Sequence, residues 1–273
     1  MLGDSDMSGQ AVPNPPDRTM RTLRTVFFLA GLSLTAAPAV AAPLTPGHPE
    51  RQHDCTLPTF TTGTYAPTVD ADDFTADVDN PWFPLPPGET QVSVGVKDAK
   101  HAVDVFHVTR RVVVLDGVPT RVVDDRLYLN GVLTERTSDY YSQDECGNVW
   151  YFGEDTAELD PHGRVDNTDG SWRAAVHGAQ PGVYMQADPQ VGRRFRQEWA
   201  PKAAEDVYRA LSLRAAVTVP VGSFTGSLRT EETTALEPGV VDNKYYVHGV
   251  GQVEEAAVRG GGDELLRLVD VLR

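Results

Sequence analysis

Turn-forming dipeptides recur through the sequence and separate segments that are rich in β-branched residues. Asp116-Gly117 and Asn130-Gly131, for example, enclose the valine-rich segment 118–129. Asp-Gly and Asn-Gly favour two-residue hairpin turns, because both central residues of such a turn must accept positive φ angles. Regular spacing of these turns predicts long antiparallel strands joined by hairpins.

The predicted strands begin near Gln91 and continue almost to the last residue. Residues 202–213 fit a short helix and a strand equally well, because helix-favouring residues are followed by an alternating pattern. The resulting fold class is all-β, with about eight to eleven antiparallel strands in a meander that forms a barrel or a strongly curved half-barrel. The predicted strands are 91–94, 101–115, 118–129, 132–141, 149–154, 223–236, 240–248, 252–258 and 264–272.

The first 41 residues are typical of a secretory signal peptide. Arg21 and Arg24 precede a short apolar run, and small residues at 38–41 provide a cleavage site. The run is shorter than the roughly 20 residues that a membrane-spanning helix needs. Met20 is a plausible alternative start, which would remove residues 1–19. The mature protein is expected to begin near Ala42, without a lipid anchor, and to be soluble in the periplasm or outside the cell.

Two regions follow the signal peptide. Residues 42–88 are rich in Pro, Thr and Asp and lack apolar periodicity, which predicts an irregular arm. Residues 89–273 carry all of the strand signals and are expected to form a single antiparallel β domain.

The chain is strongly acidic, with a formal net charge of −15. The signal segment contains three acidic residues and three arginines, so the mature protein keeps the whole excess. Such a charge repels nucleic acids and anionic lipid head groups. We therefore expect no nucleic-acid partner, and no later segment is apolar enough for stable membrane insertion. The oligomeric state is left open.

Cys55 and Cys146 are the two cysteines of the chain. In an oxidising compartment such a pair forms a disulfide more often than it remains as two thiols. The bond would link the irregular arm to the β domain.

Nucleotide-binding loops and metal-binding motifs are absent from the sequence, as are Cys-x-x-Cys and His-Glu-x-x-His patterns. The acidic segments 70–79 and 166–170 fit solvated turns better than calcium loops, because the second lacks a carboxylate at the first ligand position. No cofactor and no metal site are expected.

The segment 147–155 is the most informative for function. Strict alternation places Trp150, Phe152 and Glu154 on one face of a strand and Tyr151 and Asp155 on the other. Aromatic residues on both faces indicate that neither face is fully solvated. One face belongs to the core, and the other is covered by a loop or lines a pocket.

Three functions are compatible with these features. The first is binding of a small or lipid-like ligand inside the curved sheet, with Trp150, Tyr151, Trp172 and Glu198 as lining residues. The second is a secreted hydrolase that uses Glu154 and Glu198, which requires two carboxylates about 5 to 9 Å apart. The third is a structural envelope protein without a ligand. Whether the protein is an enzyme is left open.

Three motifs carry a resemblance to a family of exported bacterial proteins. They are Val-Asp-Asn-Pro-Trp-Phe-Pro-Leu at 78–85, Asn-Val-Trp-Tyr-Phe-Gly-Glu-Asp at 148–155 and Lys-Tyr-Tyr-Val-His-Gly-Val-Gly at 244–251. The resemblance covers nearly the whole mature chain but implies no activity. The meander is also similar in architecture to the half-barrels of periplasmic lipoprotein carriers, which implies a ligand inside the sheet only by analogy.

Overall fold

A computed structural model describes residues 55–273. Apart from one short 3-10 turn, η1 (Ala71–Asp73), its regular structure consists of β-strands, which confirms the predicted all-β class. The strands are β1 (Phe74–Thr75), β2 (Thr90–Lys97), β3 (Lys100–Leu115), β4 (Val118–Leu129), β5 (Val132–Asp144), β6 (Val149–Leu159), β7 (Val165–Asn167), β8 (Trp172–Arg173), β9 (Gln180–Met185), β10 (Arg194–Arg196), β11 (Glu198–Trp199), β12 (Asp206–Val219), β13 (Gly222–Thr234), β14 (Val241–Val247), β15 (Gly251–Arg259) and β16 (Leu265–Leu272).

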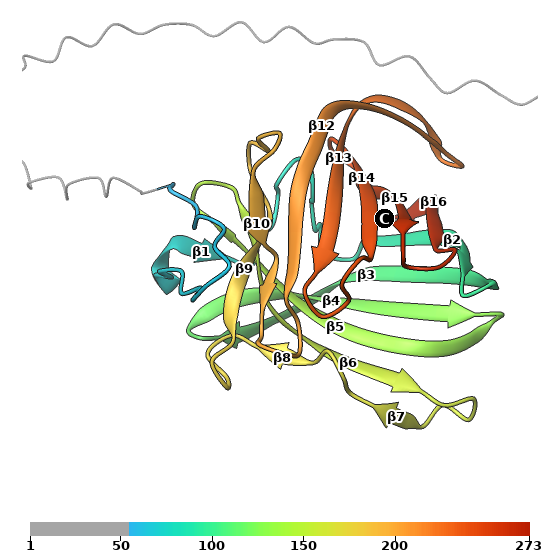
Figure 1. The fold of residues 1–273 in the computed structure, drawn as a ribbon, viewed down its shortest axis with the longest axis horizontal. Coiled ribbons are helices and arrows are strands. Elements are labelled where there is room, and N and C mark those ends of the chain that lie inside the picture. The colour runs from blue at the N-terminus through green and yellow to red at the C-terminus, as the bar shows by residue number, and fades with distance from the viewer. Residues whose placement is uncertain (1–54) are drawn as a thin grey trace, which may run out of the picture. The chain divides into compact units, whose positions relative to one another are not determined.

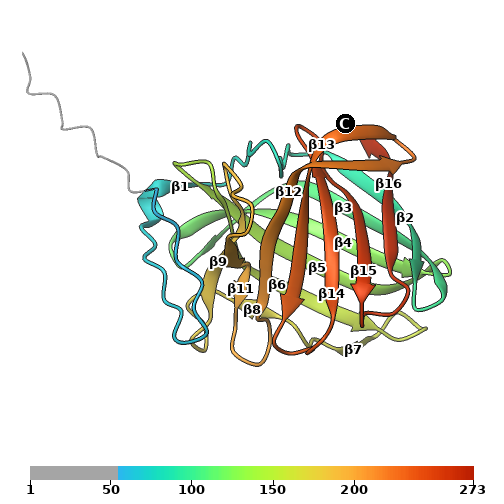
Figure 2. The same ribbon diagram turned by 45° about the horizontal axis from the view of Figure 1, so that its top comes forward.

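The strands form one antiparallel sheet that curls into a nearly closed barrel (Figures 1 and 2). Its order is β10-β12-β13-β14-β15-β16-β2-β3-β4-β5-β6-β9-β11. The two ends of this order, β10 and β11, are separated in the chain only by Gln197. Because β10 pairs with β12 and β11 pairs with β9, the segment 194–199 brings the two sheet edges together. Such closure protects edge strands from pairing with other chains.

The predicted meander is confirmed, and the turn dipeptides lie where the strands reverse. Asp116 and Asn130 adopt φ angles of 50° and 49°, as two-residue hairpins require. Residues 206–213, part of the segment that fitted a helix and a strand equally, belong to β12, which pairs with β13 along most of its length. Pairing within the sheet outweighs a modest helix propensity.

The N-terminal arm covers part of the barrel's outer surface. The first strand, β1, pairs with β5, and the Phe74 ring packs edge-on against Trp150 and Phe152 at centroid distances of 5.9 and 5.5 Å. Arg121 of β4 binds the arm through the Ala76 carbonyl, at 3.1 Å. The outward-facing Trp150 and Phe152 of β6 are therefore buried beneath the arm.

One segment of the arm, 80–85, closes an end of the barrel, and we call it the plug. The Phe83 ring points inward and packs against Tyr184 and Tyr141, at centroid distances of 4.6 and 5.2 Å. The Pro81 carbonyl accepts a hydrogen bond from the backbone N–H of Gly249 at 2.7 Å. The plug thus joins the first and third motifs of the sequence resemblance.

Asn80 holds the plug in place. Its side-chain carbonyl accepts hydrogen bonds from the backbone N–H groups of Trp82 and Phe83, and its amide donates to the carbonyls of Gly147 and Gln186. The residue is 1% exposed, so these partners have little access to water. Buried polar groups that lose their partner carry the full desolvation cost.

We therefore expect Asn80→Ala to lower the free energy of unfolding by about 2 kcal/mol, the cost of leaving such groups unpaired. Urea denaturation followed by tryptophan fluorescence measures this change. Thr61→Ala is the control, because its exposed hydroxyl bonds only the Thr64 carbonyl at 3.5 Å. Equal unfolding midpoints for the two variants would contradict the role of Asn80.

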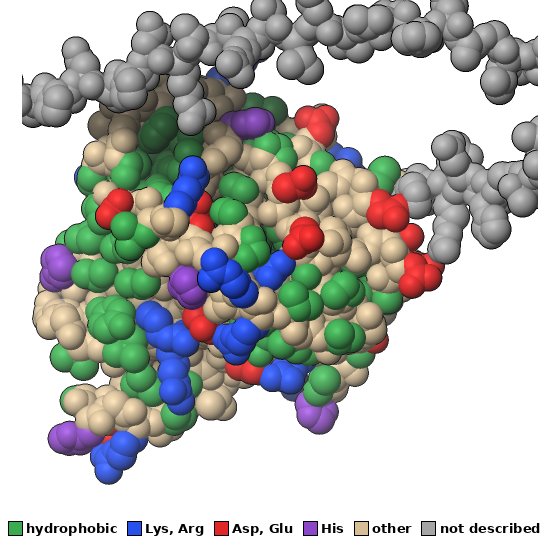
Figure 3. All heavy atoms as spheres, turned by 180° about the vertical axis from the view of Figure 1, so that it is seen from behind, with side chains coloured by type: hydrophobic (Ala, Val, Ile, Leu, Met, Phe, Trp, Pro, Cys, Tyr) green, Lys and Arg blue, Asp and Glu red, His purple; other side chains and the backbone are tan. Residues whose placement is uncertain are grey.

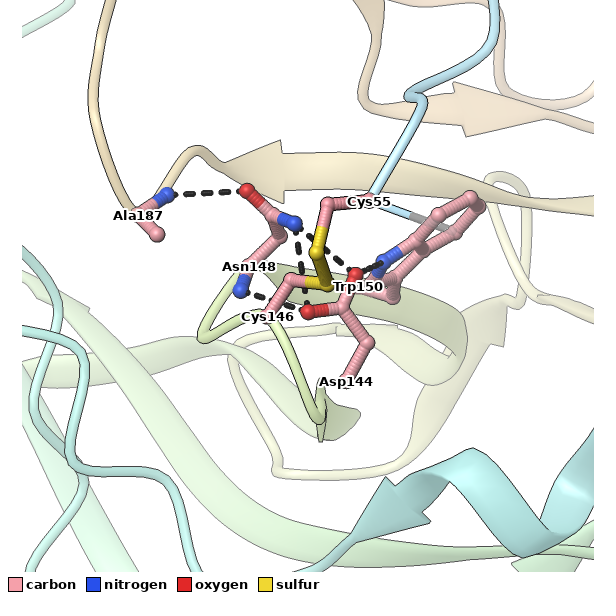
Figure 4. Close-up of a disulfide and its surroundings, with 6 residues drawn as sticks. All are labelled: Cys55, Asp144, Cys146, Asn148, Trp150 and Ala187. Carbon is pink, nitrogen blue, oxygen red and sulfur yellow. Dashed lines mark hydrogen bonds between the residues drawn. A yellow bond between two sulfur atoms is a disulfide. The ribbon is translucent and has the colours of Figure 1, made fainter. Parts of the chain in front are cut away.

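The predicted disulfide between Cys55 and Cys146 is confirmed, with the two Cα atoms 5.7 Å apart (Figure 4). The turn that carries Cys146 is held by Asp144, whose carboxylate accepts hydrogen bonds from the Asn148 backbone N–H at 2.8 Å and from Trp150 Nε1 at 2.8 Å. Asn148 Oδ1 in turn accepts the backbone N–H of Ala187 at 2.9 Å. The arm is thus attached at a rigid point of the barrel.

Residues 55–273 contain no helix of the length and hydropathy required to cross a bilayer. The predicted signal peptide, 1–41, and the first part of the predicted arm lie outside the described residues.

Candidate functional site

The barrel encloses a cavity of about 230 Å³, which the plug residue Phe83 borders. Its walls come from the inward faces of β2 to β5, β9 and β14 to β16. Apolar side chains would fill the centre of a purely structural barrel, since burying charges is costly. Here charged and aromatic side chains form much of the wall, and together the lining residues are Phe83, Gln91, Ser93, Lys97, Asp104, Phe106, Asp125, Leu127, Glu135, Asp139, Tyr141, Tyr184, Lys244, Gln252, Glu255, Glu264 and Leu266.

Four carboxyl groups on β3, β4 and β5 form what we call the acidic wall: Asp104, Asp125, Glu135 and Asp139. Burial raises the pKa of Asp104 well above its usual range, and the neighbouring Asp125 carboxyl, to which it is hydrogen-bonded, raises it further. Burial also raises the pKa of Asp139, and the charges of Asp125 and Glu154 add to the effect. Within residues 55–273, no Lys, Arg or His forms a salt bridge with any of the four.

The cavity also contains two lysines, each of which already has a glutamate partner. The ammonium group of Lys97 lies 3.0 Å from Glu264. The ammonium group of Lys244 lies 2.9 Å from Glu232 and 3.6 Å from Glu255. Burial lowers the pKa of Lys244, but the two carboxylates outweigh it, and the net pKa is raised well above the usual value. Both cations are therefore engaged by glutamates, and the charge of Lys97 also acts on Glu135 of the acidic wall.

The outer surface of the barrel has a different charge arrangement. Asp124, which adjoins Asp125 but points outward, binds Arg111 at 2.6 Å, and Glu231 and Glu254 also bind arginines. From behind, basic side chains lie beside acidic ones over the middle of the molecule (Figure 3). Outward carboxylates thus have arginine partners, whereas those of the acidic wall do not.

Tyrosine side chains complete the cavity beside the acidic wall. Tyr141 is only 3% exposed, and it lines the cavity. Its ring stacks on Tyr151 at 4.7 Å and meets Tyr184 edge-on at 5.0 Å. A tyrosine hydroxyl in such a wall can both donate and accept a hydrogen bond.

A second group of carboxyls extends from the acidic wall toward β8 and β11. The Tyr151 hydroxyl donates to Asp139 at 2.5 Å, and its ring meets Trp172 edge-on at 5.6 Å. Trp172 Nε1 donates to Glu198 at 3.0 Å. Burial raises the pKa of Glu198 well above its usual range, and the charge of Glu154 raises it further. Burial raises the pKa of Glu154 itself to about 7.

A β-bulge decides the position of Glu154, and here the strict alternation predicted for 147–155 is wrong. Residues 152 and 153 of β6 both lie opposite Tyr140, since Asp139 pairs with Glu154 and Tyr141 with Tyr151. The extra residue turns Glu154 to the inward face of Tyr151. Gly153 has a φ angle of 139°, and a Cβ atom there would lie 2.4 Å from the Trp172 carbonyl oxygen, so only glycine fits.

The predicted ligand-binding residues fall in two places. Tyr151, Trp172 and Glu198 lie together inside the barrel. They do not line the cavity themselves, but Tyr151 hydrogen-bonds to Asp139, which does. Trp150 lies beneath the arm beside Asp144, on the opposite face of the sheet. The proposed catalytic pair, Glu154 and Glu198, is in the same cluster, but neither side chain lines the cavity.

Sequence reasoning missed the residues that form the cavity itself. Asp104 lies between Ala102 and Phe106 on one face of β3. A carboxylate within this otherwise apolar face was the signal that could have marked it as a cavity residue. No comparable signal marks Asp125, because its neighbour Asp124 is also acidic and the pair suggests a solvated strand.

No three His, Cys, Asp or Glu side chains within 55–273 converge closely enough to hold a metal ion. The carboxyls of the acidic wall are instead spread along three strands. This spacing suits a ligand with distributed polar groups better than a single ion.

No protein-family model matches the chain, and no curated protein matches it. Two solved structures are similar. One is described as an exported protein with a YmcC-like fold from Bacteroides fragilis, with a TM-score of 0.42, 12% identity and coverage of 70% of this chain and 99% of that one. The other is described as a lipoprotein from Parabacteroides distasonis, with a TM-score of 0.37, 12% identity and coverage of 70% and 98%.

Proposed function

We propose that this protein is exported and binds a small polar molecule inside its barrel. The observation that carries the proposal is the cavity of about 230 Å³ with charged walls. Its size is near the lower limit of ligand pockets, which hold about 300 to 1,000 Å³. The signal-peptide pattern and the disulfide support an oxidising compartment outside the cytoplasm.

The polarity of the walls favours a hydrophilic ligand over the lipid-like one that the sequence left open. An acyl chain would leave the carboxyls of the acidic wall both buried and unsolvated, which is costly. A polar ligand can hydrogen-bond to these groups and to Tyr141.

Native mass spectrometry tests the proposal. The protein is incubated with a small-molecule extract of its host, desalted and measured, and we expect an adduct that denaturation releases. Ser93→Phe places a ring in the cavity and should reduce the bound fraction at least tenfold. Ser223→Phe makes the same change at an exposed position of β13 and should leave the bound fraction unchanged.

An absence of adduct on the wild-type protein would contradict the proposal. Equal adduct on the two phenylalanine variants would place the ligand outside the barrel and would contradict it as well.

A further inference from the structure

The cavity carries more carboxyl groups than cations. Asp104, Asp125, Glu135 and Asp139 form no salt bridge among the described residues, although the charges of Lys97 and Arg126 act on Glu135 and Asp125. Lys97 and Lys244 are each in contact with a glutamate instead. The acidic wall therefore lacks a cation at salt-bridge distance, and a ligand can supply one.

We infer that the ligand is a small organic amine, with one or two ammonium or guanidinium groups on a short chain. This inference rests on the proposed function and names the ligand class of the same site. An ammonium group can donate hydrogen bonds to Asp104, Asp125 and Asp139, which all line the cavity. Charge-assisted hydrogen bonds of this kind are about twice as strong as neutral ones.

The aromatic residues of the wall suit the same ligand class. Phe106 and Tyr184 line the cavity together with Tyr141, and ring faces attract organic cations by about 0.5 to 2 kcal/mol. Tyr141 lines the same cavity, and its hydroxyl can accept a hydrogen bond from an ammonium group.

Other ligand classes fit less well. An anion would meet four unpaired carboxyls and two lysines that are already engaged. A neutral sugar can hydrogen-bond to these carboxyls but carries no positive charge to stabilise their ionised form. The cavity volume of about 230 Å³ corresponds to about eight water molecules at roughly 30 Å³ each. A ligand that fills it therefore has a comparable number of non-hydrogen atoms.

Isothermal titration calorimetry at low ionic strength tests the inference with putrescine and agmatine as probes. Wild-type protein should bind at least one of them with a stoichiometry of one. The neutral isostere 1,4-butanediol and the dianion succinate should bind at least tenfold more weakly.

Two neighbouring aspartates provide a matched pair of variants. Asp125→Asn removes a charge from the cavity and should weaken amine binding at least tenfold. Asp124→Asn makes the same change one residue away, on the outer face, and should keep the affinity within about twofold of wild type. Asp139→Asn is a second inward variant, and circular dichroism verifies that each variant is folded.

The inference fails if the diol binds as tightly as the diamine, if neither amine binds, or if both inward variants bind amines like wild type. A neutral or anionic adduct from the host extract, lost in Ser93→Phe, would overturn the amine while leaving the proposed function intact. Absence of any adduct would overturn both.

Discussion

Replacing Cys55 and Cys146 together with serine should lower the free energy of unfolding by about 4 kcal/mol. The bond spans a sequence separation of 91 residues, and closing a loop of this length restricts the unfolded chain by about that amount in the chain-entropy model. The barrel itself should survive, because its strand pairing does not involve either cysteine. Urea denaturation with and without reductant, followed by circular dichroism, measures the difference.

The double variant and the reduced wild-type protein should agree, because both lack the same bond. Each should also show a larger dependence of unfolding free energy on urea, since an unconstrained unfolded chain exposes more surface. Unfolding midpoints that do not change on reduction would show that the disulfide contributes nothing to stability.

Replacing Glu154 with glutamine should remove part of the pH dependence of stability. Burial raises the folded-state pKa of Glu154 from 4.5 to about 7. Between these values the folded protein keeps a proton that the unfolded chain has released, so stability falls as pH rises through this range. At about 1.4 kcal/mol per pKa unit, the loss is on the order of 3 kcal/mol, and glutamine, which does not ionise, avoids it.

Thermal or urea unfolding at a series of pH values from 4 to 8 measures this difference. At the acidic end Glu154→Gln should resemble wild type, and above pH 7 it should be the more stable protein. Glu158→Gln, an exposed position of the same strand, should keep the wild-type profile. Parallel profiles for wild type and Glu154→Gln would contradict the burial of this carboxyl.

The plug brings the three sequence motifs together in space. The sequence marked 78–85, 148–155 and 244–251 as motifs without indicating that they meet. In the barrel, Trp82 packs edge-on against His248 at 5.5 Å, and Asn80 bonds the Gly147 carbonyl just before the second motif. These residues are far apart in the chain, so only barrel closure brings them together.

The residues that line the cavity were not predicted, but part of the neighbouring cluster was grouped from the sequence. Tyr151, Trp172 and Glu198 were grouped from the sequence because aromatic and acidic residues recur together, and they do lie in one cluster. Trp150 was grouped with them on the same pattern, but it lies on the other face of the sheet, beneath the arm. Composition alone cannot separate these cases, because the arm buries Trp150 about as completely as the barrel buries Tyr151.

The sequence by itself determined most of the long strands, their hairpins and the disulfide, because alternation, turn dipeptides and a single cysteine pair act locally or leave little choice. The tertiary structure decided which charges face inward. Asp125 and Asp124 are indistinguishable in sequence, and the bulge at Gly153 turns Glu154 inward against the simple alternation. The physical reason is that a side chain's environment depends on which face of the sheet the barrel closes around, and a single extra residue reverses that face.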